Sequence, residues 1–134
     1  MLEARKRGVE IEIIVPGKTT DARLVQKASR HFWGELLEAG IKIYEFHPTM
    51  YHCKLVILDE VWTSVGSTNI DERALRLNDE ANMNFYDPRF AREQIEIFKT
   101  DLTRSAPYTM VQWRQRTVGE KLSDWLASLL RSQI

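Results

Sequence analysis

The alternation of apolar and polar positions changes in an orderly way along the first third of the chain. The segment VEIEIIVPG, residues 9–17, alternates and then becomes continuously apolar, which predicts a strand that enters a buried sheet and stops at Pro16. Over residues 21–39 the apolar positions recur at helical spacing, and Gly40 follows as a stop. The segment IKIYEF, residues 41–46, alternates again as a second strand. Two strands joined by a helix predict parallel neighbours in an α/β layered fold.

Further along, the pattern predicts a hairpin, another strand and two helices. HCKLVILD, residues 52–59, is typical of a strand, and VWTSVGS, residues 61–67, of the return strand after a tight turn. ANMNFYD, residues 81–87, predicts one more strand, and residues 88–105 predict a helix with proline in its first turn. Around Pro107 the sequence predicts a short linker. It leads into a C-terminal segment over residues 108–134 that ends in an amphipathic helix.

The apolar side of that final helix has two interpretations. Its members are Leu122, Trp125, Leu126, Leu129 and Leu130. Packing in the core or at an interface is the ordinary function of such a face. A position at a lipid interface, with Trp125 among leucines, is the alternative.

The start of the chain predicts a helix end. LEARKRG, residues 2–8, places basic residues near the C-terminal end of a helix, with Gly8 as a left-handed stop. We therefore expect either that the sequence is a fragment of a longer protein or that this helix is simply short.

Composition limits the possible classes of function. With 134 residues, 43% of them apolar, the chain is predicted to form a single domain over residues 1–134. Nineteen basic and nineteen acidic side chains give a formal net charge of zero, so any anion must be bound by a local site. The single cysteine, Cys53, excludes an intrachain disulfide, and no apolar run approaches the roughly 20 residues that span a bilayer. A cytoplasmic location, or a peripheral one at the inner membrane, is expected.

Polar residues with phosphate-binding chemistry flank the predicted hairpin. On an extended strand His52 and Lys54 share one face, while Cys53 points to the other. If the return strand brings GSTN alongside, Ser67 and Asn69 add neutral donors, and the adjacent glycine lets backbone approach a ligand closely. A fixed positive charge, directional donors and a side chain that titrates near neutrality together suit a phosphate group.

The complete spacing resembles a known signature. His52, Lys54, Asp59, Gly66–Ser67 and Asn69 match HxKxxxxDxxxxxxGSxN, the HKD motif of the phospholipase D superfamily, over residues 52–69. The flanking segments RGVEIEIIVPG, LLEAGIKIYEF and NIDERALRLNDEANMNFYD are similar to the C-terminal half of bacterial cardiolipin synthases. The resemblance weakens only after about Pro107. It implies an α/β fold, a phospholipase D-like layered α/β/α sandwich with a mixed central sheet.

The resemblance also implies catalytic and phosphate-binding roles. His52 would attack phosphorus and form a phosphohistidine, or would be the counterpart that protonates the leaving alcohol. Lys54 and Asn69 would hold the non-bridging oxygens, assisted by Ser67. Glu80, at the position of the family's acidic residue, would orient the histidine ring and support a developing imidazolium.

Two further motif positions are expected to be structural, and no cofactor is implied. Asp59 would tie the turn after the strand, and Gly66 would allow close backbone approach. The family's mechanism needs no metal, and the histidines lack zinc-like spacing. The upstream His47 matches nothing in the motif. Where relatives commonly have serine after arginine, this chain has Arg73–Ala74, which removes a hydroxyl near the asparagine loop.

One motif is half of what a phospholipase D site uses. We therefore expect a partner: a second HKD-containing half, or a second copy of this chain about a twofold axis. The implied function is phosphatidyl transfer or phosphodiester hydrolysis through a phosphohistidine, on a phospholipid or another phosphodiester, with peripheral membrane contact as an option. The alternatives are a single-motif, homodimeric, metal-independent endonuclease and a catalytically incomplete half-domain. Zero net charge disfavours a nucleic-acid partner.

Overall fold

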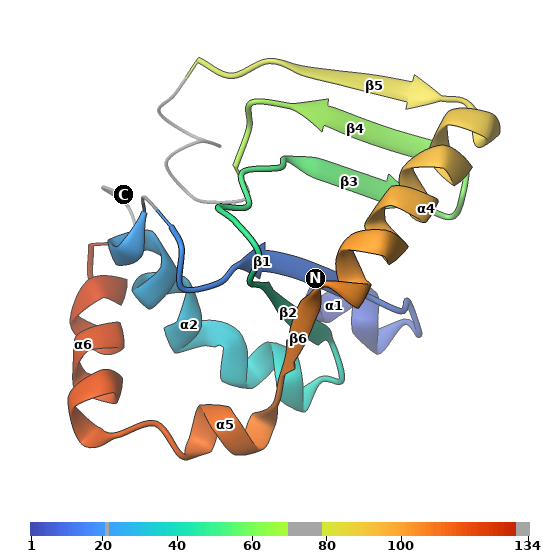
Figure 1. Ribbon diagram of the computed structural model, residues 1–134. Helices are drawn as coiled ribbons and strands as arrows, with labels where there is room; N and C mark the ends of the chain where they lie inside the picture. Colours follow the sequence, from blue (N-terminus) through green and yellow to red (C-terminus); the bar gives the residue numbers. More distant parts are fainter. Residues whose placement is uncertain (21, 70–78, 131–134) are drawn as a thin grey trace. The chain divides into compact units, whose positions relative to one another are not determined.

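The computed structural model describes residues 1–20, 22–69 and 79–130 and divides into two compact units (Figure 1). The first unit combines residues 1–51 with residues 104–134, and the second is His52–Thr103. Each combines a three-stranded sheet with helical structure, so the predicted mixed α/β fold is confirmed.

The sheet of the first unit is mixed. Its strands are β1 (Glu12–Pro16), β2 (Lys42–Phe46) and β6 (Ser105–Tyr108), in the order β1-β2-β6. Strands β1 and β2 are parallel, as the strand–helix–strand pattern predicted, and β6 is antiparallel to β2.

Strand β6 corrects one sequence-based prediction. The residues around Pro107 were expected to be a linker, but Pro107 lies in β6, opposite Tyr44 of β2. A proline has no N–H to give to a ladder, and an edge strand tolerates this because one of its sides has no neighbour. The loop-like composition of SAPY therefore hid a short edge strand.

The described part of the first unit contains the helices α1 (Leu2–Lys6), α2 (Arg23–Glu38), α5 (Met110–Arg114) and α6 (Val118–Ser128). Gly8 after α1 and Gly40 after α2 have φ angles of +92° and +83°, so both predicted left-handed stops are confirmed.

The core of the first unit lies between its sheet and α2. Ile41, Ile43 and Phe46 are almost fully buried, as is Trp33 of α2. The Trp33 ring meets the Tyr108 ring edge-on, with 4.9 Å between centroids. Helix α2 also packs against α6 (Figure 1).

Among its described residues, the second unit consists of an antiparallel sheet and one packed helix. Its strands β3 (Leu55–Leu58), β4 (Trp62–Gly66) and β5 (Asn82–Tyr86) lie in chain order, and α4 (Pro88–Thr103) packs against β3 and β4. Ala91 is fully buried, and the Phe85 and Phe90 rings lie 4.7 Å apart. The predicted hairpin, third strand and helix are all present.

The turn between β3 and β4 has a special backbone. Asp59 and Glu60 have φ angles of +49° and +58°, and the Val61 N–H donates to the Leu58 carbonyl at 3.1 Å. Aspartate tolerates this left-handed region better than most residues.

Candidate active site

Motif residues gather at one end of the β3-β4-β5 sheet. The register pairs Leu55 with Val65, which brings Lys54 level with Gly66, and the Gly66 N–H donates to the Lys54 carbonyl at 3.3 Å. On the other side of β4, Gly66 pairs with Asn82 of β5. We call this end, defined by Lys54, Gly66 and Asn82, the motif end of the sheet.

Gly66 and Ser67 fasten the start of β5 to the end of β4. A Cβ on Gly66 would collide with the Asn82 side-chain oxygen and the Ala81 carbonyl, so only glycine fits there. The Ser67 N–H donates to the Ala81 carbonyl at 3.0 Å, and the Ala81 N–H donates to Ser67 Oγ at 3.0 Å. Because Oγ accepts this bond, the hydroxyl hydrogen of Ser67 remains a donor for a ligand.

The histidine and lysine of the motif precede β3. The strand begins at Leu55 and is therefore shorter than the predicted residues 52–59. The Lys54 ammonium lies 3.5 Å from the backbone oxygen of His52, so the positive charge stays beside the histidine. His52 is exposed, Lys54 is half-buried, and Cys53 between them is exposed. An external ligand can therefore reach this segment.

Asn69 and Glu80 flank the residues that join β4 to β5. Asn69 is exposed two residues beyond Ser67, and Glu80 is half-buried immediately before Ala81. Since Ser67 and Ala81 are bonded in both directions, the backbone places both residues near the motif end. Arg73–Ala74, where the sequence departs from the family pattern, lies outside the described residues.

Asp59 is the motif residue that the structure does not bring to this end. It follows the last residue of β3, whereas Lys54 precedes the first. At about 3.3 Å per residue, the strand separates their Cα atoms by roughly 16 Å. Asp59 lies in the hairpin turn, so it cannot contact a phosphate held by Lys54 of the same chain.

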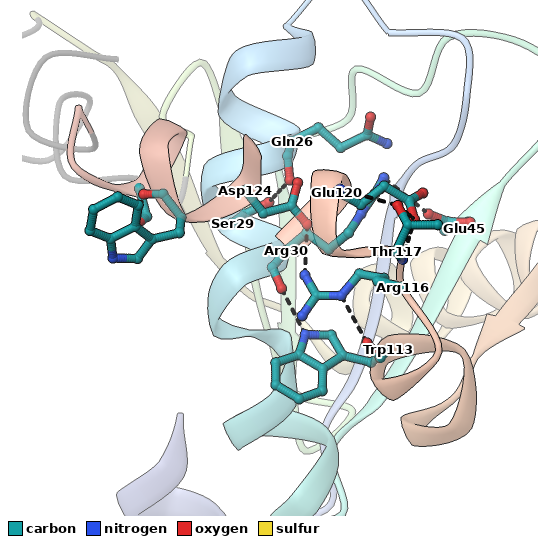
Figure 2. A network of polar contacts seen from close by, with 11 residues as sticks. Gln26, Ser29, Arg30, Glu45, Trp113, Arg116, Thr117, Glu120 and Asp124 are labelled. Atoms are coloured by element: carbon teal, nitrogen blue, oxygen red, sulfur yellow. Dashed lines mark hydrogen bonds and ion pairs between the residues drawn. The ribbon is translucent and has the colours of Figure 1, made fainter. Parts of the chain in front are cut away.

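The first unit contains a second polar region, which the sequence analysis missed (Figure 2). An Arg116 nitrogen donates to Asp124 at 2.6 Å, and Arg116 Nε donates to the Trp113 carbonyl at 2.8 Å. The guanidinium lies over the Trp113 ring, 4.4 Å from its centroid, and the indole N–H donates to the Arg30 carbonyl at 3.0 Å. We call Trp113, Arg116 and Asp124 the buried cluster.

A cavity of about 400 Å³ lies beside the buried cluster. Its lining is polar: Lys18, Gln26, Arg30, Glu45, Tyr108, Gln112, Gln115, Arg116 and Glu120. Arg30 pairs loosely with Glu45 at 3.9 Å, and burial raises the pKa of the Tyr108 hydroxyl. The charges of opposite sign in this lining make it less suited than the motif end to binding an anion.

Potential metal ligands do not gather in the part of the chain that the structure describes. No group of three or more His, Cys, Asp or Glu side chains there is placed to hold an ion. Within the same residues, no helix combines the length and apolar character needed to cross a membrane.

The fold is similar to that of solved phospholipase D-like proteins. The phosphatidylserine synthase of Haemophilus influenzae Rd KW20 superposes with a TM-score of 0.72 at 15% identity, over 98% of this chain and 37% of that one. The phospholipase D family member Nuc of Salmonella typhimurium superposes with a TM-score of 0.66 at 22% identity, over 81% and 70% of the respective chains. Fold and motif thus define the class of phospholipase D-like proteins.

Sequence comparison identifies the family. The family described as "Cardiolipin synthase, PLD-like domain" matches residues 1–102, and the chain belongs to it. The minor cardiolipin synthase ClsB of Bacillus subtilis is 36% identical over 130 residues, and cardiolipin synthase A of Proteus mirabilis is 39% identical over 131 residues. These alignments cover 97% and 95% of this chain, which spans 32% and 27% of the two relatives.

Proposed function

We propose that this chain supplies one catalytic motif of a cardiolipin synthase-like enzyme. The enzyme would transfer a phosphatidyl group from one glycerol hydroxyl to another, and water as a competing acceptor would give hydrolysis. The observation that supports this most is the arrangement at the motif end, where Ser67 follows the Gly66 that bonds to Lys54, and the Lys54 ammonium lies 3.5 Å from the backbone oxygen of the exposed His52. The names of the two relatives support a phospholipid substrate.

In the proposed reaction His52 is the nucleophile. Its ring nitrogen attacks phosphorus as the bond to the leaving glycerol oxygen breaks, and the histidine of a second motif donates a proton to that oxygen. The second histidine then takes the proton of the acceptor hydroxyl. That oxygen attacks phosphorus and breaks the phosphorus–nitrogen bond. The two histidines could also exchange these roles.

The other motif residues act on charge. Lys54 and Asn69 would hold the non-bridging oxygens of the phosphoryl group as negative charge develops on them, and Ser67 would donate its hydroxyl hydrogen. Glu80 would accept from the His52 ring, fix its tautomer and stabilise the imidazolium. This mechanism uses no metal or cofactor, so turnover should be insensitive to a chelator.

The second motif would come from outside these 134 residues. A further part of a longer enzyme is the source we favour, because the chain spans only 32% and 27% of the two relatives. A second copy of the chain is the alternative. Mixing wild-type and His52→Ala chains would separate the two: if two copies share a site, inactive mixed pairs lower activity more than simple dilution does.

A chimaera tests the proposed function directly. The 130 residues of Bacillus subtilis ClsB that align with this chain would be replaced by it, and cardiolipin formation from phosphatidylglycerol would be measured. We expect the chimaera to form cardiolipin, and the same chimaera with His52→Ala to be at least about a thousandfold slower.

His47→Ala is the matched control, since His47 is also exposed but lies outside the motif. It should leave the rate unchanged. Equal rates for the His52→Ala and unsubstituted chimaeras would contradict the assignment. A folded chimaera without lipid transfer, together with chelator-resistant DNA cleavage by the purified chain, would favour the endonuclease alternative.

A further inference from the structure

Helix α6 has its apolar side chains on the wrong side for core packing. The residues it buries are small or polar: Asp124, Ala127 and Ser128 are 1%, 3% and 8% exposed. Its outer face is apolar, with exposures of 83%, 53%, 46%, 50% and 60% for Val118, Leu122, Trp125, Leu126 and Leu129. Of the two ordinary roles of such a face, packing in the core is therefore wrong, and packing at an interface stays a prediction.

The inner side of the helix explains this orientation. Small residues allow α6 to lie close against α2, and Asp124 must stay inside because it pairs with the buried Arg116. Turning the leucines inward would expose Ala127 and bring the Arg116–Asp124 ion pair into water. The outer face, defined by the five apolar residues above, is therefore held outward by contacts within the first unit.

The charges of α6 are sorted in the same way. Asp124 is buried and pairs with Arg116, whereas Glu120 is exposed and accepts hydrogen bonds from the Thr117 N–H and hydroxyl at the start of the helix. Lys121 is exposed and lies one helical turn before Trp125, at the border of the outer face. The outer face thus has one lysine at its border, and the exposed carboxylate of Glu120, two residues before Leu122, lies on the other side of the helix.

We propose that the outer face of α6 docks on the surface of a phospholipid bilayer that contains anionic lipids. An exposed leucine stripe with a tryptophan and a bordering lysine suits the boundary between headgroups and acyl chains. The choice of lipid rather than protein rests on this charge arrangement and on the phospholipid substrate of the proposed function. Docking would hold the first unit at the membrane without a spanning helix.

Vesicle flotation with the purified 134-residue chain tests this proposal. Vesicles would contain phosphatidylcholine alone, or phosphatidylcholine and phosphatidylglycerol in equal parts. We expect binding to the mixed vesicles, weakened roughly tenfold or more by Leu122→Gln/Leu126→Gln, because two leucines lose their transfer into the apolar layer. Lys121→Gln should reduce the preference for phosphatidylglycerol vesicles.

Ile97→Gln is the matched control, because Ile97 is a helical residue with the same 53% exposure as Leu122 but lies on α4. It should bind like wild type, and circular dichroism should show all variants folded. No binding by the wild type, or equal binding by the leucine variant, would overturn the proposal. So would a dimer seen by light scattering that the leucine substitutions dissociate in the absence of vesicle binding.

Catalysis and docking fail separately. His52→Ala should float like wild type, whereas the leucine variant in the ClsB chimaera should still hydrolyse a short-chain, water-soluble phosphodiester. If the unsubstituted protein floats with the mixed vesicles but the unsubstituted chimaera neither transfers nor hydrolyses, the proposed function alone fails. If the unsubstituted chimaera is active but the unsubstituted chain does not float, docking alone fails.

Discussion

The two units use their charged groups in opposite ways. In the first unit the Arg116 and Asp124 side chains are 6% and 2% exposed and lie 2.6 Å apart, and Trp113 stacks on the guanidinium. In the second unit His52 and Asn69 are exposed, and the Lys54 ammonium lies 3.5 Å from the backbone oxygen of His52. The buried cluster satisfies its charges internally, whereas the motif end leaves donors and a cation for an external anion.

This difference separates stability from function. A buried charge that loses its partner keeps its desolvation cost, so substitutions in the buried cluster should act on folding. Lys54 is only half-buried, so its charge contributes little to folding but can stabilise a phosphoryl group, and substitutions at the motif end should act on rate. The following variants test that division, from the largest expected effect to the smallest.

Lys54→Ala should lower kcat/KM of the chimaera by roughly a hundredfold to a thousandfold, because it removes the positive charge that would stabilise the non-bridging oxygens. Its melting temperature should stay close to that of the unsubstituted chimaera. Asp59→Asn is the matched control from the same motif. It lies about 16 Å along the strand, so it should change kcat/KM by only a few-fold. A larger effect of Asp59→Asn than of Lys54→Ala would break the comparison.

Asp124→Ala should reduce the free energy of unfolding by about 3–5 kcal/mol, because Arg116 would remain buried without its partner. Urea denaturation of the chain measures this loss. The double variant Arg116→Met/Asp124→Leu should recover much of it, since both charges are then removed. If Asp124→Ala unfolds like wild type, the pair does not hold the first unit together.

Gly66→Ala should act on both properties at once. Its Cβ would displace Asn82 and Ala81, which sit beside the motif end, at a cost of about 1–3 kcal/mol for an overpacked site. The free energy of unfolding, measured by urea denaturation, and kcat/KM should both fall. Val65→Ala, on the neighbouring residue of β4, is the control that removes volume without such a collision. A stable but slow Gly66→Ala protein would show that the glycine serves the ligand alone.

Glu120→Gln should give the smallest effect, and one that depends on pH. Hydrogen bonds from Thr117 lower the pKa of Glu120, so its charged form stabilises the folded state above the unfolded pKa, and this stabilisation is lost as pH falls through the folded pKa. Wild type should exceed Glu120→Gln in stability at neutral pH, and the two should converge in acid. Gln112 holds the equivalent position of α5. The variant Gln112→Glu should therefore be more stable than wild type at neutral pH, and the two stabilities should converge in acid.

Local patterns predicted most helices and strands because each signal lies within a few neighbouring residues. The stops at Gly8 and Gly40 and the parallel pair β1–β2 follow from residue type and spacing, and the structure has them. Strand β6 was missed because its pairing with β2 joins segments about 60 residues apart, and the only local signal was a proline that argues against a strand.

The motif was found because its residues are close in sequence, and register brings most of them together. The positions of Lys54, Gly66 and Ser67 at one end follow from hairpin pairing, which the sequence predicted. The separation of Asp59 from that end also follows from strand length. The buried cluster was not found, because Arg116 and Asp124 resemble surface residues until α6 packs on α2. The sequence signal available for this cluster was Asp124, a charged residue on the narrow polar side of α6.

The single cysteine gives this protein a built-in reporter. Cys53 is exposed and stands between His52 and Lys54, and no other cysteine occurs in the chain. A maleimide dye would therefore attach at one known position without any engineered substitution. The rate of that attachment would report, in real time, when a phosphodiester, a vesicle or a second motif approaches the proposed catalytic segment.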